Sequence, residues 1–162
     1  MRSIGFTGTK RGMTSKQRGR VDSILRQIVQ RGPLTAHQGD HIGCDCDFAG
    51  LCRMVGRDKI MLVSHPPSDS HSRAFYPCDA ERSPAGFAER TRAIVDESDL
   101  LIACPRQQGE EGRGGTWAVV GYAKAKGKRV IIIRPDGKVD DVRVEKGVLR
   151  GPAWGDPPRL SR

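Results

Sequence analysis

Short aliphatic runs alternate with amphipathic segments of helical length along most of the chain, and this alternation constrains the fold more than any other feature. Continuously aliphatic strands that are separated by single helices are typical of a parallel sheet covered on both faces. Because crossovers between parallel strands are right-handed, the pattern predicts a doubly wound α/β fold of about five strands in the order 3-2-1-4-5. The predicted strands are Ser3–Thr7, Leu34–His37, Ile60–Val63, Leu100–Ala103 and Val130–Ile133.

Two glycine-rich segments follow the first and the fourth of these strands. In the predicted order these two strands are neighbours and the chain reverses direction between them, so a ligand crevice is expected at their carboxyl ends. The segments that arrive there are Gly8–Gly12 and Gly109–Gly115, and the second runs directly into a predicted helix, Thr116–Lys126. Glycines let the backbone approach a ligand closely, and the free amides of a first helical turn bind anions. The sequence therefore predicts an anion site where the two segments meet.

The charge of the chain supports an anionic partner. Its 162 residues carry a formal net charge of +9, and residues 1–31 contain eight Lys and Arg residues against the single acid Asp22. Such a field attracts phosphate groups, on nucleotides or on nucleic acid. Only two Trp, two Tyr and four Phe are present, which is little aromatic surface for stacking single-stranded bases. A phosphorylated small molecule suits this charge at least as well as a polynucleotide does.

Apolar runs and cysteine usage bear on compartment and cofactors. No apolar run approaches the roughly 18 residues that span a bilayer, and the N-terminal segment lacks the apolar core of a signal peptide, so we expect a cytoplasmic protein without a membrane partner. Cys44, Cys46 and Cys52 lie near His37 and His41, but structural zinc sites usually pair two such knuckles and the sequence offers no second one. We therefore expect free thiols, no metal and no cofactor.

Two stretches depart from the alternating pattern. Residues 65–84 are rich in Pro, Ser and His, and this loop is long enough to be functional or mobile. Beyond Pro135 the composition turns to Gly, Pro and charged residues. We predict a folded domain over residues 1–134 and an irregular C-terminal tail over residues 135–162.

Four segments, taken in order, resemble the SLOG superfamily of Rossmann-like proteins, which includes the DprA/Smf DNA-processing proteins, the LOG phosphoribohydrolases and the molybdenum-cofactor carrier proteins. They are Ile4–Gly8, His37–Asp45, Glu89–Ala103 and Gly114–Thr116, and the resemblance covers about residues 3–134. It implies that residues 1–134 form a nucleotide-binding domain whose partner is a phosphorylated small molecule, a nucleotide or a derivative of one. Many relatives dimerise through helices beside the sheet, so the resemblance also implies a homodimer.

The resemblance and the predicted turns together give a set of candidate ligand-binding residues. By resemblance, Gly114–Thr116 hold a phosphate, Gly8 and Thr9 form the opposite wall, and Gly39 with Asp40 lies at the exit of the second strand. Lys10 and His41 are added because they lie in the same turns, and Arg90 is added because it resembles an arginine of the LOG hydrolases. The complete set is Gly8, Thr9, Lys10, Gly39, Asp40, His41, Arg90, Gly114, Gly115 and Thr116.

Two parts of the LOG pattern PGGxGTxxE are missing, its PGG opening, replaced by Gly112-Arg-Gly-Gly, and its glutamate, and the second separates binding from catalysis. Arg90 matches, by its distance from the fourth strand, the arginine that LOG hydrolases use with a glutamate to break an N-glycosidic bond. That glutamate falls at Val119, which can neither stabilise an oxocarbenium ion nor activate water. A hydrolase of this sequence needs another carboxylate. The catalytic candidates are Arg90 with Asp40, and the alternative carboxylates are Asp45, Glu110 and Glu111.

Three functions remain open at this point. The first, which the missing glutamate favours, is a protein that senses, carries or sequesters a nucleotide-derived ligand. The second is a hydrolase or transferase that acts on the N-glycosidic bond of nucleoside monophosphates. The third is a DNA-processing module resembling DprA, whose DNA binding would depend steeply on salt because neutralised phosphates release counterions.

Overall fold

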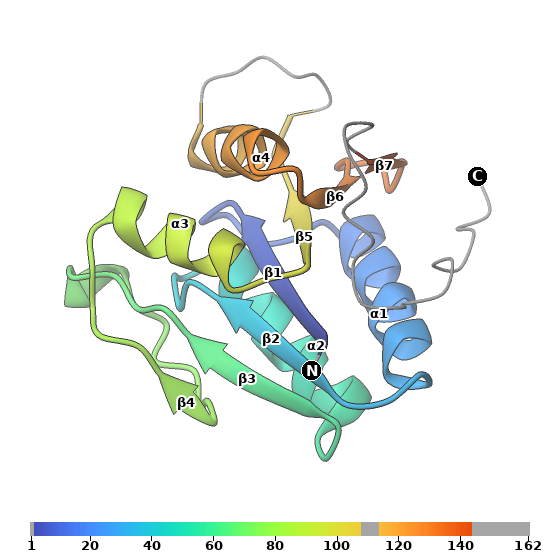
Figure 1. Cartoon of the computed structure of the whole chain (residues 1–162), viewed down its shortest axis with the longest axis horizontal. Helices are drawn as coiled ribbons and strands as arrows, with labels where there is room; N and C mark the ends of the chain where they lie inside the picture. The colour runs from blue at the N-terminus through green and yellow to red at the C-terminus, as the bar shows by residue number, and fades with distance from the viewer. Residues whose placement is uncertain (1, 108–113, 144–162) are drawn as a thin grey trace.

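Seven strands form one sheet in the order β4-β3-β2-β1-β5-β6-β7 in the computed structural model, which describes residues 2–107 and 114–143 (Figure 1). All neighbouring strands are parallel except β6 and β7, which are antiparallel. The strands are β1 (Arg2–Gly8), β2 (Leu34–Gln38), β3 (Ile60–Ser64), β4 (Ala80–Glu81), β5 (Leu100–Cys104), β6 (Arg129–Ile133) and β7 (Val139–Val142). The helices are α1 (Ser15–Val29), α2 (Cys44–Gly56), α3 (Phe87–Asp96) and α4 (Gly115–Ala125), with a short 3₁₀ helix, η1 (Ser70–Ser72).

Both faces of the sheet are covered, and each carries its own buried cluster (Figure 1). On one face α1 and α2 pack over side chains such as Ile4 and Phe6 of β1, where the Phe6 ring stacks on Phe48 of α2 with the centroids 4.4 Å apart. On the other face α3 and α4 pack over side chains such as Leu101 of β5 and Ile132 of β6. Burial on both faces of the sheet explains why β3, β5 and β6 are runs of aliphatic residues instead of alternating polar and apolar residues.

The predicted doubly wound topology is confirmed, because the five expected strands are β3, β2, β1, β5 and β6 in the expected order. Two edge strands were not predicted. The two-residue strand β4 lies inside the stretch read as a loop and pairs with β3 through Val63 and Ser64. No helix in the described part of the chain is long and apolar enough to cross a membrane.

Strand β7 corrects the expectation of an irregular chain beyond residue 134. It turns back on β6 through a tight turn in which Gly137 adopts a φ of 87° and the amide of Arg134 donates to the carbonyl of Lys138 at 2.8 Å. The dipeptide Asp136-Gly137 is a common hairpin signal. Two of the four residues of the strand that follows are aspartates, so the sequence of β7 does not resemble a buried strand. The rest of the predicted tail, residues 144–162, lies outside the described residues.

Helix α1 holds the strand ends that border the crevice. Its N-terminus is closed by a capping box between Thr14 and Gln17. Gln17 is only 2% exposed, and its Nε2 donates to the carbonyls of Pro105 at 2.8 Å and Ile133 at 2.9 Å, just beyond β5 and at the end of β6. One buried amide thus connects α1 to two neighbouring strand exits.

Candidate functional site

The described parts of the two glycine-rich segments meet at one edge of the sheet, whereas residues 109–113 of the second segment lie outside the described residues. Strand β1 pairs directly with β5, with Gly8 opposite Cys104 at the carboxyl end. A cavity of about 730 Å³ opens there between the turn after β1, the turn after β2, helix α3 and the N-terminus of α4. Of the ten candidate binding residues, nine line this cavity. They are Gly8, Thr9, Lys10, Gly39, His41, Arg90, Gly114, Gly115 and Thr116.

The N-terminus of α4 presents backbone amides to the cavity without a side-chain cap. Its N-cap is Gly114, no side chain of the described residues caps it, and its first turn contains no acidic residue. Gly114, Gly115 and Thr116 all line the cavity. Because the first amides of a helix have no intrahelical partners and lie at the positive end of the helix dipole, this end is suited to an anion.

The turn after β1 forms the opposite wall through close backbone packing against the start of α2. The carbonyl of Thr9 accepts a hydrogen bond from the amide of Cys44 at 2.9 Å. Gly43 adopts a φ of 99°, and a Cβ there would collide with the backbone of Lys10. Only glycine fits this junction, so the sequence Gly43-Cys44 fixes the position of the wall.

Arg90 is held inside the cavity with part of its guanidinium unpaired. The residue is 8% exposed, and its Nη1 donates to the carbonyl of Gly39 at 3.0 Å. Its buried Nε has no hydrogen-bond partner among the described residues. Burial lowers the pKa of Arg90, although Asp45 and Asp40 oppose this shift. An arginine with a free buried donor is suited to a phosphate or carboxylate.

Among the described residues, Asp45 rather than Asp40 is the carboxylate that lines this cavity. It is 9% exposed, lines the cavity and accepts a hydrogen bond from the amide of His41 at 3.2 Å. Burial raises the pKa of Asp45 to about 6, even though the His41 amide and Arg90 favour its charged form. A carboxyl group with such a pKa can act as a general acid or base near neutral pH.

Asp40 is turned away from the cavity, which argues against the catalytic role suggested for it. It is fully buried, and its carboxylate accepts hydrogen bonds from Nε of Arg73 at 2.8 Å and from the amide of Tyr76 at 3.1 Å. A left-handed φ of 51° at Asp40 directs the turn this way. Its carboxylate therefore fixes the part of the loop around Arg73 and Tyr76 against the turn after β2. The other two candidate carboxylates, Glu110 and Glu111, lie outside the described residues.

Several residues that line the cavity were missed from the sequence. One face of α3 contributes Phe87, Thr91 and Ile94 beside Arg90, and this i, i+3, i+4, i+7 spacing could have identified them once Arg90 was singled out. Trp117 follows the α4 N-terminus, and its buried Nε1 has no hydrogen-bond partner among the described residues. With Lys10, the cations Arg11 and Arg106 complete a basic rim.

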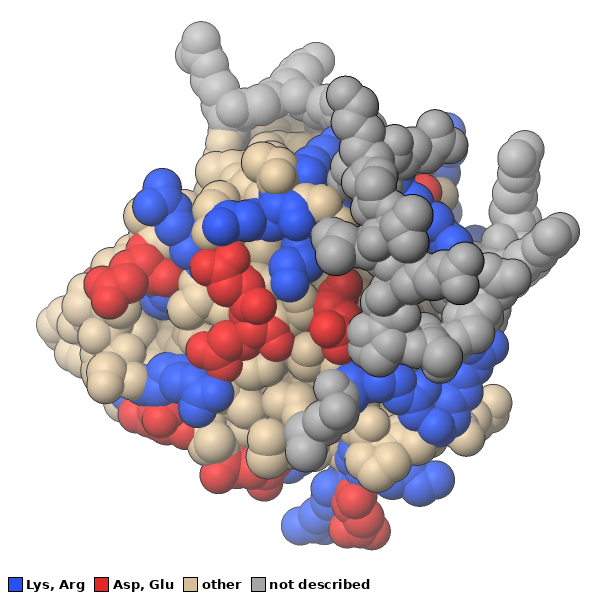
Figure 2. All heavy atoms as spheres, viewed as in Figure 1, with Lys and Arg blue, Asp and Glu red and all other residues tan. Residues whose placement is uncertain are grey.

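The basic N-terminal region is less available than its composition suggested. Arg18 pairs with Asp47 at 2.9 Å and Arg26 pairs with Asp22 at 2.8 Å. On the face drawn in Figure 2, Lys and Arg lie beside Asp and Glu at the centre and left, and Lys and Arg gather at the lower right. Part of the basic charge of residues 1–31 is therefore neutralised within the fold.

The cysteines are free thiols and take no part in a metal cluster within the described residues. Burial raises the pKa of Cys44 to about 11, so it stays a neutral thiol. The one group of potential ligands that converges in the described part of the chain is His37, His65 and Glu97, outside the cavity. Burial lowers the pKa of both imidazoles, to about 4 for His65, and a hydrogen bond from Arg82 lowers that of Glu97.

No protein-family model matches the chain, and no curated protein matches it. Among solved structures it is similar to a molybdenum cofactor binding protein from Rippkaea orientalis (TM-score 0.63, 21% identity, 82% of this chain and 76% of that one). It is also similar to the molybdenum cofactor carrier protein from Chlamydomonas reinhardtii (0.59, 18%, 82% and 76%) and to DNA processing protein A from Helicobacter pylori (0.58, 14%, 81% and 64%). The chain therefore has the Rossmann-like fold that its resemblance to the SLOG superfamily predicted.

Proposed function

We propose that the cavity binds a phosphorylated small molecule, a nucleotide or a derivative of one, and that the protein senses, carries or sequesters it. The observation that carries this proposal is the convergence of two donor sets on one cavity. These are the N-terminus of α4, which no described side chain caps, and the buried guanidinium of Arg90, whose Nε has no hydrogen-bond partner among the described residues. A buried donor such as this Nε costs free energy unless a ligand or water satisfies it.

The remaining lining divides the cavity into a polar and an apolar part. The phosphate is assigned to the amides of Gly115 and Thr116 and to the basic rim, whereas Phe87 and Trp117 offer aromatic surface for a base or another flat ring. A volume of about 730 Å³ falls within the range of small-molecule sites. Two proteins of the same fold are described as binding or carrying the molybdenum cofactor, which supports a cofactor-like small molecule here.

Ligand binding can be tested by thermal shift and calorimetry with AMP and ADP-ribose, using adenosine as the ligand that lacks phosphate. We expect the phosphorylated compounds to stabilise the protein and adenosine to have a much smaller effect. Arg90→Gln should weaken binding by about 10- to 100-fold, because charge-assisted hydrogen bonds are lost. Arg92→Gln is the matched control, since Arg92 lies on the same helix but contacts Tyr122 outside the cavity.

Native mass spectrometry of the freshly purified protein tests the same proposal without a choice of ligand. A co-purified phosphorylated compound that is lost from Arg90→Gln and retained by Arg92→Gln supports it. If AMP and adenosine increased the melting temperature equally, and did so in both variants, the assignment of the phosphate site would be contradicted.

Asp45 supports a second candidate function, cleavage of an N-glycosidic bond. The LOG glutamate position, Val119, is 3% exposed and packs in the buried cluster beneath α4, so it offers no carboxylate. Asp45 instead places a carboxyl group of raised pKa beside Arg90 in the cavity. Release of free base from nucleoside monophosphates, lost in Asp45→Asn, would establish this function, whereas tight binding without release supports the first.

The homodimer and the cytoplasmic location remain predictions.

A further inference from the structure

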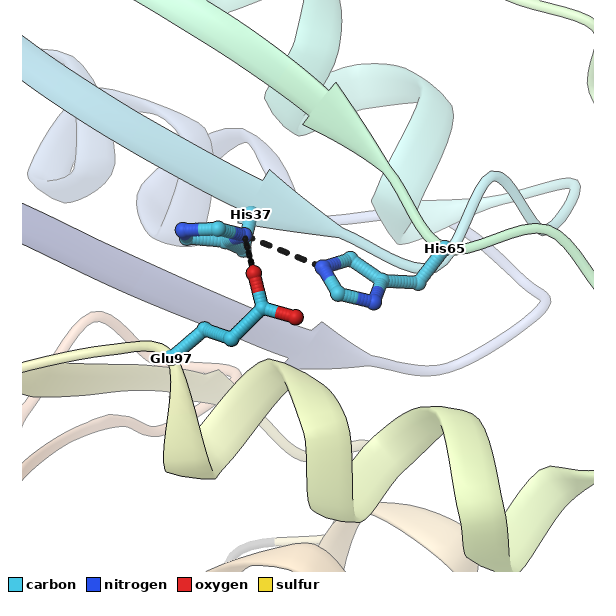
Figure 3. Close-up of side chains that lie close together, drawn as sticks. All are labelled: His37, His65 and Glu97. Atoms are coloured by element: carbon cyan, nitrogen blue, oxygen red, sulfur yellow. Dashed lines mark hydrogen bonds and ion pairs between the residues drawn. The ribbon is translucent and has the colours of Figure 1, made fainter. Parts of the chain in front are cut away.

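Three side chains from distant parts of the chain converge beside α3, apart from the ligand cavity (Figure 3). His37 lies in β2, His65 directly follows β3, and Glu97 is the C-cap of α3. Nδ1 of His37 is 3.0 Å from Nε2 of His65 and 3.7 Å from a carboxylate oxygen of Glu97. One potential ligand atom from each residue lies within 4.8 Å of the other two.

Hydrogen bonds join only two of these three side chains to one another. The two imidazoles can share a single N–H between Nδ1 of His37 and Nε2 of His65. The carboxylate of Glu97, at 3.7 Å from the same Nδ1, is too far to accept a hydrogen bond from it, and it reaches the surface, where it pairs with Arg82. The imidazoles are only 3% and 1% exposed. A cation placed between the three ligand atoms would coordinate all of them at once.

We propose that His37, His65 and Glu97 form a binding site for a divalent transition metal ion, with Zn²⁺ as the best fit. Zinc binds imidazole nitrogen at about 2.0–2.1 Å in tetrahedral geometry, which separates neighbouring ligand atoms by roughly 3.3 Å. Two of the three separations between the ligand atoms, 3.0 and 3.7 Å, bracket that value, and the third is within 4.8 Å. Two imidazoles and one carboxylate favour zinc and similar ions over Mg²⁺ or Ca²⁺, which prefer oxygen ligands.

The surroundings of the cluster fix the orientation of its ligands. Arg82 donates to both carboxylate oxygens of Glu97, at 3.3 and 2.7 Å, and its own amide donates to the carbonyl of Ser64 at 2.8 Å. Ligating carboxylates in metal sites are commonly held by such outer hydrogen bonds. Glu97 is exposed at the surface, so an ion can enter from that side, and three protein ligands leave a fourth position for water.

The test uses the full chain with reduced cysteines, equilibrated with Zn²⁺ and, separately, with Co²⁺. We expect one Zn²⁺ per chain after dialysis, an increase in melting temperature, and the visible spectrum of tetrahedral Co²⁺ without the near-ultraviolet absorption of a thiolate ligand. Glu97→Gln, which keeps the shape of the side chain, should weaken Zn²⁺ binding at least about tenfold, and His65→Gln should abolish it. Each variant's melting temperature without metal establishes that it is folded.

Two control variants separate this site from other possible ligands. His71→Gln removes an exposed histidine of η1 outside the cluster, and Cys46→Ser removes a partly exposed thiol; both should bind Zn²⁺ as the unmodified chain does. Equal Zn²⁺ affinity in folded Glu97→Gln and the unmodified chain would overturn the proposal, as would a thiolate signature in the Co²⁺ spectrum or no bound Zn²⁺ at all. AMP binding that persists with Zn²⁺ removed leaves the proposed cavity function unaffected.

Discussion

Two regions at the same edge of the sheet, the turn after β2 and the wall formed by α3 and the start of α4, differ in whether their polar groups are paired. In the turn after β2, Asp40 is paired with Arg73 and with the amide of Tyr76, and Arg73 is paired in addition with Glu81 at 3.0 Å. Beside it, the α4 N-terminus has no side-chain cap and Nε of Arg90 has no partner within the described residues. Groups that satisfy one another stabilise a fold, whereas groups that are held apart are available to a ligand.

The comparison predicts its largest effect on the paired side. Asp40→Ala should lower the free energy of unfolding by about 3 kcal/mol, because it leaves Arg73 and a backbone amide without their buried partner, and denaturant unfolding measures this. Asp40→Asn should cost less. The affinity of either folded variant for AMP should change little, since Asp40 does not line the cavity. An Asp40 variant that is stable but cannot bind AMP would show that Asp40 serves ligand binding and not the stability of the fold.

Gly39 joins the two regions, and its substitution should damage the ligand side most. A Cβ at Gly39 would collide with Nη1 of Arg90 and lie 2.7 Å from Oδ2 of Asp45. We expect Gly39→Ala to weaken AMP binding by about 100-fold, or roughly 2.7 kcal/mol, and to destabilise the fold by about 1–3 kcal/mol. Calorimetry and denaturant unfolding measure the two effects. Gly121→Ala, whose Cβ meets nothing within 4 Å, is the control and should leave binding unchanged.

The pKa of Asp45 gives a pH test of intermediate size. As the pH falls through about 6, the carboxylate becomes neutral and its repulsion of a bound anion is lost. The affinity for ADP-ribose, whose pyrophosphate keeps its charge in this range, should therefore rise several-fold between pH 7.5 and 5. Asp45→Asn should bind as tightly at pH 7.5 as at pH 5. A pH dependence that survives in this variant must come from another group.

The same pKa has a consequence for stability, with the sign fixed by linkage. Because the folded protein holds the proton of Asp45 more tightly than the unfolded chain does, this contribution is fully present below about pH 4 and is lost as the pH rises through about 6. Unfolding experiments on Asp45→Asn and on the unmodified chain should diverge across this window. Parallel curves would show that Asp45 is ionised in the folded protein.

The smallest effect is expected at Gly114. A Cβ there meets nothing within 4 Å, and the backbone is extended with a φ of 165°, so Gly114→Ala should change the free energy of unfolding by less than about 0.5 kcal/mol. Its effect on AMP affinity then reports crowding at the anion site alone. A large loss of stability would show that the α4 N-terminus is packed more tightly than described.

The topology could be predicted from the sequence because β3, β5 and β6 are aliphatic runs and helix-length segments separate all five central strands. The edge strand β4 could not, since it has two residues. Strand β7 carried a hairpin signal at Asp136-Gly137, but two of its four residues are aspartates, which is unlike a buried strand. The choice between Asp40 and Asp45 depended on a left-handed backbone at Asp40, which no periodicity reveals. Likewise His37 and Glu97 lie 60 positions apart, and only the packing of α3 brings them into contact.

The hydrogen bonds of Gln17 have a consequence for how the protein responds to its ligand. Because a single amide joins α1 to the carboxyl ends of β5 and β6, we expect this side of the crevice to stay rigid when a ligand binds. Helix α3 buries only Arg90, Ile94 and Val95, and we expect it to be the side that moves. Slowed amide exchange upon AMP binding should accordingly appear along α3, with α1 already protected in the free protein.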